Sequence, residues 1–546
     1  MFTRAISLLT LAATLLTAGV ANAQTETGRV AGTVIDTQGG VLPGATVKLK
    51  NIGSGTTRST VTDGNGAYLF ANVQPTGYEV VVELQGFRSW GARIVVTVGG
   101  SAAVNAKLEV GGVQEAVSVT AGAPLVNTVN GEIATTINEA QIRELPTITR
   151  NVYDLVALSG NVAPDDQHFF RGTGFAINGM RSSSTNVLLD GAANNDEFSA
   201  TVGQEVPLDS VQEFSVITNN FSAQYGRATG GVVNVATKSG TNQFRGTAYE
   251  FLRNDTLSTI TVDNRANDIE KGEFTRHQTG FSIGGPIKRD RLHFFSNLEY
   301  IRVRSADTEI SWVPTAQFLA ASSSATQAFF NRYGKLSATA GQTLSRGQVA
   351  AIVGTGAGAF NSLPADLPVF ARIEKSLPID AGGGDPQDNC QWVNRFDYSL
   401  SNNTQMYVRY ALQNQEAQAG TLASSPYDGY DTGYLNKNHN VLASVTHVFS
   451  PTLTSQSKVV WNLLVWLFAP ERRSAADVVY EPKYAGAAAG VSHCVSRLSA
   501  LERRQRPSVR RPAEPVPDLP GSDVGAGQAR YTVRRVVRAH FGRPDP

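Results

Sequence analysis

The second half of the chain is built from segments in which apolar and polar residues alternate, and this pattern restricts the fold more than any other feature. Clear examples are Thr247–Arg253, Thr279–Gly285 and Leu292–Tyr300. A period of two places successive side chains on opposite faces of an extended strand. Such strands belong either to a soluble sheet with one buried face or to a membrane barrel with one face toward lipid.

Two further strand pairs extend this pattern toward the C-terminus. Turn residues separate the members of each pair, and aromatic residues lie near the strand ends, as in the interfacial girdles of membrane barrels. The pairs are Val393–Tyr398 with Gln405–Leu412 and Val441–Val448 with Leu453–Leu463. Residues 305–390 lack the alternation and predict a long external loop.

The N-terminus predicts export from the cytoplasm. Met1–Ala23 combines a basic Arg4, the apolar run Ala5–Val20 and the small-residue site Ala21-Asn22-Ala23, which is typical of a cleaved signal peptide. An uncleaved anchor is the alternative, but the run is short for a spanning helix. No later stretch reaches about 18 uninterrupted apolar residues, so we expect any membrane insertion to use β-strands.

Charge and composition argue against several classes of function. The chain has 47 Lys+Arg against 46 Asp+Glu, which gives no basic excess for nucleic acid. Its 2 cysteines are too few for a disulfide scaffold or a four-thiolate zinc site. None of the 7 histidines lies in a His-Glu-x-x-His motif, and nucleophile-elbow and phosphate-loop motifs are absent. We therefore expect neither an enzyme nor a bound cofactor or metal.

The segment from Gly28 to Val110 predicts about seven short strands, the spacing of a β-sandwich. Asp63-Gly64-Asn65-Gly66 is a turn signal between two of them. Three blocks resemble the carboxypeptidase regulatory-like domain: Val30–Val34, Leu42–Val47 and Thr62–Tyr68. The resemblance implies a transthyretin-like β-sandwich over residues 24–110 without catalysis of its own.

The middle of the chain predicts mixed helices and strands. Ile137–Leu145 is expected as a short helix with Asn138 as N-cap, and Arg150–Leu158 as another. Val211–Ile217 alternates as a strand. Glu115–Ala121, beside the glycine linker Gly111-Gly112, also alternates. That segment is suited to adding a strand to the sheet edge of another protein, or it is one more strand of the next domain.

Several blocks in this region resemble the plug domain of TonB-dependent outer-membrane receptors. They are Phe175–Arg181, Asn186–Gly191, Val211–Ile217, Ser222–Gly226 and Gly230–Gly240. The resemblance implies an α+β plug over residues 111–240 that sits inside a barrel. The resemblance is closest to the Oar-like subgroup of this family, which carries the same N-terminal sandwich. The residues that indicate this subgroup are Leu145-Pro146, Arg150–Tyr153 and Arg171-Gly172.

In this family a segment before the plug is the TonB box, the strand that a periplasmic energy-coupling protein of the TonB type pulls. The resemblance therefore implies that protein, outer-membrane lipid and an unidentified extracellular ligand as partners, with no nucleic acid. The candidate box residues are Glu115, Ala116, Val117, Ser118, Val119, Thr120 and Ala121.

The expected barrel is incomplete. A plug of this size fills a barrel of about 22 strands, whereas residues 241–468 provide room for about seven to ten. Residues 469–546 form an aberrant tail that is rich in Arg and Pro and has no Lys after Lys483. A frameshift near residues 465–490 explains this change, and a genuine basic tail that contacts anionic surfaces is the alternative.

These features together predict a mainly β chain with a sandwich, a plug and a partial transmembrane β-barrel. The function expected from the resemblance is an outer-membrane TonB-dependent receptor of the Oar-like subgroup, present as a truncated or frameshifted copy. The alternative is an exported periplasmic or surface module that binds or adheres without transport.

Overall fold

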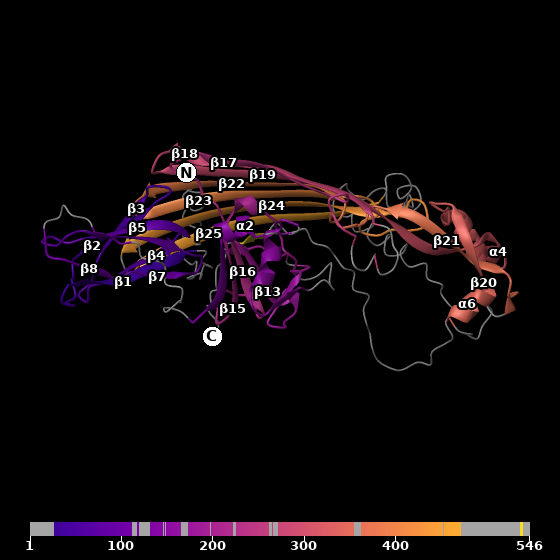
Figure 1. Cartoon of the computed structure of the whole chain (residues 1–546), viewed down its shortest axis with the longest axis horizontal. Helices are drawn as coiled ribbons and strands as arrows, with labels where there is room; N and C mark the ends of the chain where they lie inside the picture. The colour runs from indigo at the N-terminus through magenta and orange to yellow at the C-terminus, as the bar shows by residue number, and fades with distance from the viewer. Residues whose placement is uncertain are drawn as a thin grey trace, which may run out of the picture.

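The computed structural model describes residues 27–111, 117–119, 131–145, 147, 149–164, 173–196, 198–221, 225–260, 265, 271–353, 362–450, 453–470 and 536–538. The predicted signal peptide and nearly all of the predicted tail therefore lie outside the described residues. Figure 1 shows long strands that run along the molecule, with the N-terminal sandwich at one end, a lobe carrying β20 and β21 at the other, and the plug against one face.

The N-terminal domain is a β-sandwich, as its strand spacing predicts. One sheet has the order β4-β1-β7 with β8 also on β1, and the other has the order β3-β2-β5-β6-β9. Val30, Val47, Phe70 and Val80 form part of the core between the sheets. The strands are β1 Gly28–Asp36, β2 Thr46–Asn51, β3 Thr57–Val61, β4 Ala67–Val73, β5 Thr76–Glu83, β6 Trp90–Val96, β7 Ser101–Ala103, β8 Ala106–Leu108 and β9 Val117–Val119.

The turn predicted at Asp63–Gly66 connects β3 to β4. The Asp63 carboxylate accepts hydrogen bonds from the backbone N–H groups of Asn65 and Ala67, each at 2.9 Å. Gly66 has φ +71°, a left-handed conformation that costs glycine little. The acidic side chain thus closes a tight turn by bonding its own backbone. The turn is not the hairpin that its residues predict, because β3 pairs with β2 and β4 pairs with β1, so the chain crosses here from one sheet of the sandwich to the other.

The plug is a five-stranded sheet of order β10-β15-β16-β13-β14 with helices beside it. A separate two-stranded sheet pairs β11 with β12. The elements are β10 Ile133–Asn138, α2 Glu139–Glu144, η1 Val152–Leu158, β11 Val162–Pro164, β12 Phe175–Ile177, η2 Ser182–Ser184, β13 Thr185–Leu189, β14 Ala192–Ala193, η3 Leu208–Ser210, β15 Val211–Asn219 and β16 Gly231–Thr237.

The helices of the plug differ from their predicted bounds for local reasons. Asn138 caps α2 in a capping box with Gln141, so Ile137 belongs to β10 and the helix begins at Glu139. The second segment is a 3₁₀ helix, η1, rather than an α-helix. Arg150 has φ +58° and cannot belong to a helix, and the Asn151 side chain accepts from the Tyr153 N–H to start the turn.

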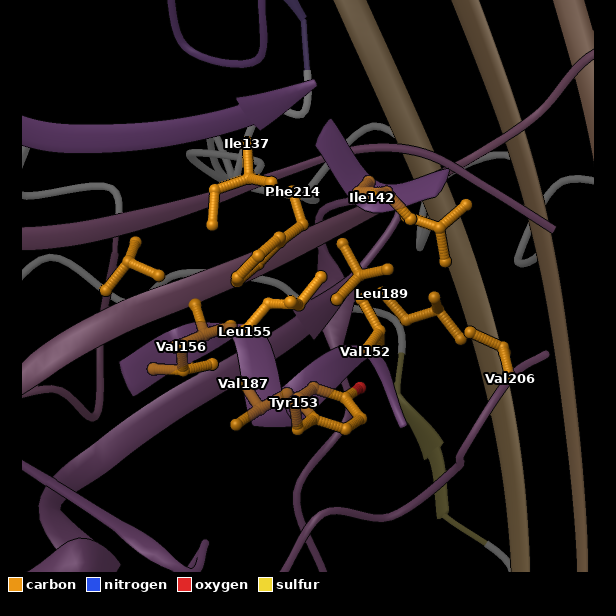
Figure 2. Packing of buried hydrophobic residues seen from close by; sticks show 14 of the residues in the cluster. Ile137, Ile142, Val152, Tyr153, Leu155, Val156, Val187, Leu189, Val206 and Phe214 are labelled. Atoms are coloured by element: carbon orange, nitrogen blue, oxygen red, sulfur yellow. The ribbon is translucent and has the colours of Figure 1, made fainter. Parts of the chain in front are cut away.

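Figure 2 shows the apolar core of the plug, where Phe214 packs among side chains from the helices and from the sheet, including Leu155 and Leu189. Two residues of the long sheet, Val393 and Ala411, belong to the same buried cluster. The plug core therefore continues into the wall beside it, which fixes the face that the plug presents to the barrel.

Seven long antiparallel strands form that wall, in the order β17-β18-β19-β22-β23-β24-β25, with the short strand β26 on β25. No pairing between β17 and β25 occurs among the described residues, so the sheet is an open, partial barrel. The strands are β17 Arg245–Asn254, β18 Glu273–Lys288, β19 Leu292–Pro314, β22 Gln387–Ser401, β23 Thr404–Ala417, β24 Thr432–Ser450, β25 Leu453–Pro470 and β26 Val536–Arg538.

A soluble sheet buries its apolar face and exposes its polar face, whereas this wall exposes its apolar face and buries its polar face. Phe396 and Val408 are paired neighbours on the face away from the plug and are 47% and 46% exposed. Asn297, Gln413 and Asn438 are on the face toward the plug and are buried. Apolar residues outside and polar residues inside are the arrangement of an outer-membrane barrel, which decides between the two alternatives that alternation left open.

The region expected as a long loop is instead a folded lobe. β19 continues to Pro314 and pairs with β21 over Asp307–Pro314, and β20 adds to β21. Val313, Ala371 and Ile373 are its buried core. Its elements are α4 Ala316–Ala320, α5 Ser324–Tyr333, β20 Ala340–Ser345, α6 Arg346–Val353 and β21 Pro368–Leu377. Over the described part of the chain, every helix is too short or too polar to cross a bilayer.

Candidate functional site at the plug–barrel interface

Asp190 is the buried acidic residue at the end of plug strand β13. It has φ +52° and is fully buried, and its backbone N–H donates to the Val235 carbonyl across the parallel pair with β16. Its carboxylate accepts from both the backbone N–H and the hydroxyl of Thr237, at 2.8 and 2.9–3.0 Å. The sheet thus holds the Asp190 side chain in one orientation.

Two arginines from the barrel wall converge on this carboxylate. Arg409 Nε on β23 lies 2.9 Å from Asp190 Oδ2, and Arg395 Nη1 on β22 lies 3.5 Å from Asp190 Oδ1. Lys458 Nζ on β25 donates to the Asp190 carbonyl at 3.1 Å. One plug residue is therefore bound by three barrel strands, and we call Asp190, Arg395, Arg409 and Lys458 the lock cluster.

The lock cluster is costly to break because its charges are out of reach of water. Arg409 is fully buried, and none of its three guanidinium nitrogens makes a hydrogen bond with any described residue, so its contact with Asp190 is an ion pair only. Arg395 has a second partner, because its Nη2 lies 2.9 Å from Asp397 Oδ1. Its guanidinium carbon lies 4.1 Å from the centre of the Tyr407 ring. Removing one partner of a buried ion pair leaves the other uncompensated, which costs about 3–5 kcal/mol.

A second polar contact lies around Glu205 of the plug. Its carboxylate accepts from Asn151 Nδ2 and from Gln413 Nε2 on β23, both at 3.0 Å. Gln391 Nε2 on β22 donates to the same group at 3.4 Å. Burial raises the pKa of Glu205, while the hydrogen bonds from Asn151 and Gln413 oppose that rise. This network joins the plug to two of the strands that carry the lock cluster.

A third contact holds the plug near the start of the barrel. Arg150 pairs with Asp209 at 2.5 Å, and its guanidinium lies 3.7 Å from the centre of the Phe251 ring on β17. Arg276 Nη2 on β18 donates to the Thr149 carbonyl at 2.7 Å. Polar contacts from the plug thus reach β18, β22, β23 and β25, and a cation–π contact reaches β17.

The sandwich is fastened to the plug and to the first barrel turn. The Val98 N–H donates to the buried carboxylate of Glu213 at 2.5 Å. Asn242, which lies between plug and barrel in the chain, donates from its backbone to the Gly53 carbonyl at 2.9 Å and from Nδ2 to the Ser54 carbonyl at 2.8 Å. Burial raises the pKa of Glu213 to about 7, although the Val98 hydrogen bond opposes that rise.

Of the candidate TonB box, only Val117–Val119 is described, as strand β9. It pairs in parallel with β6 of the sandwich through Trp90↔Val117, Gly91↔Ser118 and Ala92↔Val119. The strand therefore joins the preceding domain rather than the following one, which was the alternative that its pattern left open. Glu115, Ala116, Thr120 and Ala121 lie outside the described residues.

The lock cluster has no clear signature in the sequence. The pattern of Asn186–Gly191 predicts a strand that ends in a turn, but nothing marks its aspartate as buried. The available signal is the charge of Arg395 and Arg409 at inward-facing positions of strands that otherwise alternate. A buried charge in a membrane-spanning strand requires a partner, but the sequence does not reveal which residue supplies it.

Three family models match this chain in succession. A carboxypeptidase regulatory-like domain matches residues 29–109, a TonB-dependent receptor plug domain matches residues 129–232, and an outer membrane beta barrel domain matches residues 236–492. The three domains appear in the order that the sequence predicts.

Two curated relatives and one solved structure are similar to parts of this chain. The TonB-dependent transporter Oar of Myxococcus xanthus is 26% identical over 307 residues, which are 52% of this chain and 27% of that protein. A probable TonB-dependent siderophore receptor, PirA of Acinetobacter baumannii, is 28% identical over 147 residues, which are 25% of this chain and 18% of that protein. The match thus spans only about a quarter or less of either relative. The outer membrane transporter YddB of Escherichia coli aligns with 61% of this chain and 39% of its own, with a TM-score of 0.38 and 13% identity.

The inverted polarity of the wall and the plug seated against it define an outer-membrane β-barrel protein with an internal plug. The plug and barrel models place the chain among the TonB-dependent outer-membrane receptors, and Oar is a homologue that carries this family name. Its location is the outer membrane.

Proposed function

We propose that this chain is a receptor that moves an unidentified extracellular ligand across the outer membrane by energy-coupled displacement of its plug. The observation that carries the proposal is the lock cluster, in which Asp190 of the plug is bound by three strands of the wall. A domain held this firmly inside a wall leaves only when external work is done on it. A periplasmic coupling protein of the TonB type is the source of that work.

The position of the candidate box gives this work a route. Residues 115–121 precede β10, and β10 is the edge strand of the plug sheet, paired only with β15 among the described strands. A pull on the box therefore acts first on an edge strand, where the hydrogen bonds break pair by pair. Asp190 follows β13, which lies on the other side of β16 from β10 and β15. The pulling force therefore reaches the lock cluster only after it has acted on β10 and β15.

The experiment is photo-cross-linking in outer membranes with a photoreactive residue in place of Glu115 and the periplasmic domain of TonB as the probe. Val117→Pro or Val119→Pro removes a backbone donor from the box and should abolish the cross-link. Val126→Pro, a matched change outside the box, should leave it intact. Equal cross-linking in all three variants would remove the box assignment.

We also propose that the coding sequence changes frame near residues 465–490. The support is compositional: Lys is absent after Lys483, while Arg and Pro recur through the rest of the chain. The barrel model matches as far as residue 492, which favours the C-terminal side of that interval. Resequencing the coding DNA from residue 440 onward tests this. A second frame that resumes alternating strands supports it, whereas tryptic peptides from residues 497–546 in the expressed protein contradict it.

An exported binding or adhesion module without transport is the competing proposal. The open sheet favours it, because β17 and β25 are not paired with each other in the described part of the chain. Heat-modifiable migration on gels reports closed-barrel assembly and separates the two functions. A chain that migrates identically before and after heating would favour the binding module.

A further inference from the structure

The candidate box strand is already engaged in this structure. β9 is the outermost strand of the sheet β3-β2-β5-β6-β9, and among the described strands it pairs with β6 alone. β6 is bonded to β5 along its other side through seven residue pairs from Thr76↔Val96 to Val82↔Trp90. Without β9, the outer side of β6 would present unpaired backbone groups at a sheet edge.

Strand addition of this kind depends on backbone hydrogen bonds and therefore tolerates many sequences. The inward side chains of β6, Ala92, Ile94 and Val96, are buried in the sandwich core, so the strand is rigid with or without β9. A rigid, exposed strand edge is a ready acceptor for an extended segment. The next two strands in the chain, β7 and β8, pair with β1, and the strand after them is Val117–Val119, whose segment also alternates.

The acceptor edge is itself held in place. The Val98 N–H, just beyond the end of β6, donates to Glu213 on plug strand β15 at 2.5 Å. Asn242 bonds the Gly53 and Ser54 carbonyls and also donates to Asp290 Oδ1 in the turn between β18 and β19, at 2.7 Å. The sandwich therefore stays beside the plug and presents β6 to a strand tethered by the short linker after Val110.

We propose that strand β6 of the sandwich is the resting-state partner of the box, so that the sandwich and the coupling protein compete for the same backbone groups. This inference rests on the proposed function, because it takes Val117–Val119 as part of the box. We take the coupling protein to pair with the edge of the box that faces β6 rather than with its outer edge, and one edge of a strand cannot bond to two partners at once. The coupling protein thus binds only the fraction of chains in which β9 has left β6, and its apparent affinity falls by that fraction.

Competition in cis is effective even when each pairing is weak. Only three residue pairs join β9 to β6 in the described part of the box. A short tether nevertheless gives the box an effective concentration near β6 of the order of millimolar. The sandwich therefore controls how readily the coupling protein can bind the box and so act on the plug.

A disulfide between β6 and β9 tests the pairing. Gly91→Cys with Ser118→Cys joins directly opposed residues. Neighbouring strands lie about 4.8 Å apart, within the Cα separation of about 4.4–6.8 Å that a disulfide needs. Both native cysteines, Cys390 and Cys494, are replaced by serine in the full chain. The matched control joins Ser118→Cys to Val95→Cys, which lies on the same face of β6 but four residues further along.

We expect the Gly91–Ser118 pair to oxidise nearly completely in outer membranes and the control pair to remain reduced. In the oxidised protein, photo-cross-linking from position 115 to the periplasmic domain of TonB should fall about tenfold or more, as the free fraction of the box falls. Reduction with dithiothreitol should restore it.

The outcomes separate the two claims. If the Gly91–Ser118 disulfide fails to form while the reduced protein cross-links to TonB, the sandwich does not hold the box and this inference is wrong. If the disulfide forms but cross-linking is unchanged by oxidation, competition is wrong. If neither redox state cross-links while the disulfide forms, the strand pairing stands and the box assignment of the proposed function is what fails.

Discussion

At the scale of single residues, the molecule depends most on a carboxylate that water does not reach. Asp190 compensates Arg409, a fully buried guanidinium with no other charged partner within bonding distance among the described residues. A buried ion pair adds little net stability compared with an apolar pair, but it is expensive to break. Its consequence is specificity, because the plug fits the wall in the one position where the charges meet.

The lock cluster predicts a large effect of a single substitution. Asp190→Ala should lower the free energy of unfolding by about 3–5 kcal/mol, because it leaves Arg409 buried without its partner. The measurement is urea unfolding of the purified full chain in detergent, followed by tryptophan fluorescence.

A surface ion pair provides the control for this experiment. Glu83 bonds Lys48 at 2.6 Å with both side chains well exposed, so Glu83→Ala should cost less than about 1 kcal/mol. The double variant Asp190→Ala, Arg409→Ala should recover part of the loss, since the Arg409 charge is removed as well. Equal losses at Asp190 and Glu83 would refute the lock cluster.

Glu213 predicts a pH dependence of the sandwich–plug contact. Burial raises its pKa to about 7 from the ordinary value of 4.5, so the folded chain binds the proton more tightly than the unfolded chain. The folded state is therefore favoured at low pH and loses stability as the pH rises from about 4.5 to about 7, with little change above. Glu213→Gln keeps an acceptor for the Val98 N–H and should abolish this slope.

Thermal unfolding of both proteins at pH 5 and pH 8 measures the difference. From pH 5 to pH 8, the melting temperature of the wild-type chain should fall further than that of the Glu213→Gln variant. Parallel pH profiles for the two proteins would mean that Glu213 is solvated and that Val98 does not bond it.

At the scale of elements, the first plug helix shows how a local signal fixes a boundary. Asn138 accepts from the Gln141 N–H while the Gln141 side chain accepts from the Asn138 N–H. This capping box ends β10 and starts α2, whose Ile142 packs into the plug core.

Asn138→Ala should therefore lower the free energy of unfolding by about 1 kcal/mol, because an N–H group at the helix start loses its side-chain partner. Asn138→Asp retains the acceptor and should stay within a few tenths of a kcal/mol of the wild-type value. Chemical denaturation of the three proteins compares them. Indistinguishable unfolding of all three would mean that α2 is not stabilised by its cap.

How far the sequence predicts these elements depends on what determines them. The barrel strands follow from alternation, which is local, so their positions are predicted correctly but their lengths are too short. β19 runs for 23 residues to Pro314, well past the alternating core that ends at Tyr300. Its outer part is stabilised by pairing with β21, a strand far away in the sequence. Contacts of that range leave no periodic signal, which is why the lobe has the sequence pattern of a loop.

The same limit applies to the functional residues. The candidate box is recognisable through a family resemblance, whereas its pairing with Trp90–Ala92 does not follow from its pattern because any exposed edge would serve. The partner that Arg395 and Arg409 share lies far upstream, in a different domain. The sequence predicts the strands that carry these arginines, and only the fold reveals what they bind.

At the scale of the whole molecule, the wall is apolar outside and polar toward the plug. Phe281, Ile283, Phe396, Val408 and Val459 are outward and between 43% and 54% exposed. A soluble protein would rarely leave such a surface to water. In a bilayer the same surface is the lipid contact, and the polar inner face is covered by the plug.

The decisive question is whether that outer face contacts lipid. Val408→Lys places a charge on the outward face of β23, where it should cost about 2–4 kcal/mol near the bilayer midplane. Val61→Lys makes the same change at an exposed position of the sandwich, which is 52% accessible. The measurement is recovery of each full chain in outer-membrane fractions. If the wall faces lipid, Val61→Lys is recovered like the wild type and Val408→Lys shows a marked loss. Equal recovery of both variants, or a wild-type chain found in the soluble periplasm, would refute a lipid-facing wall.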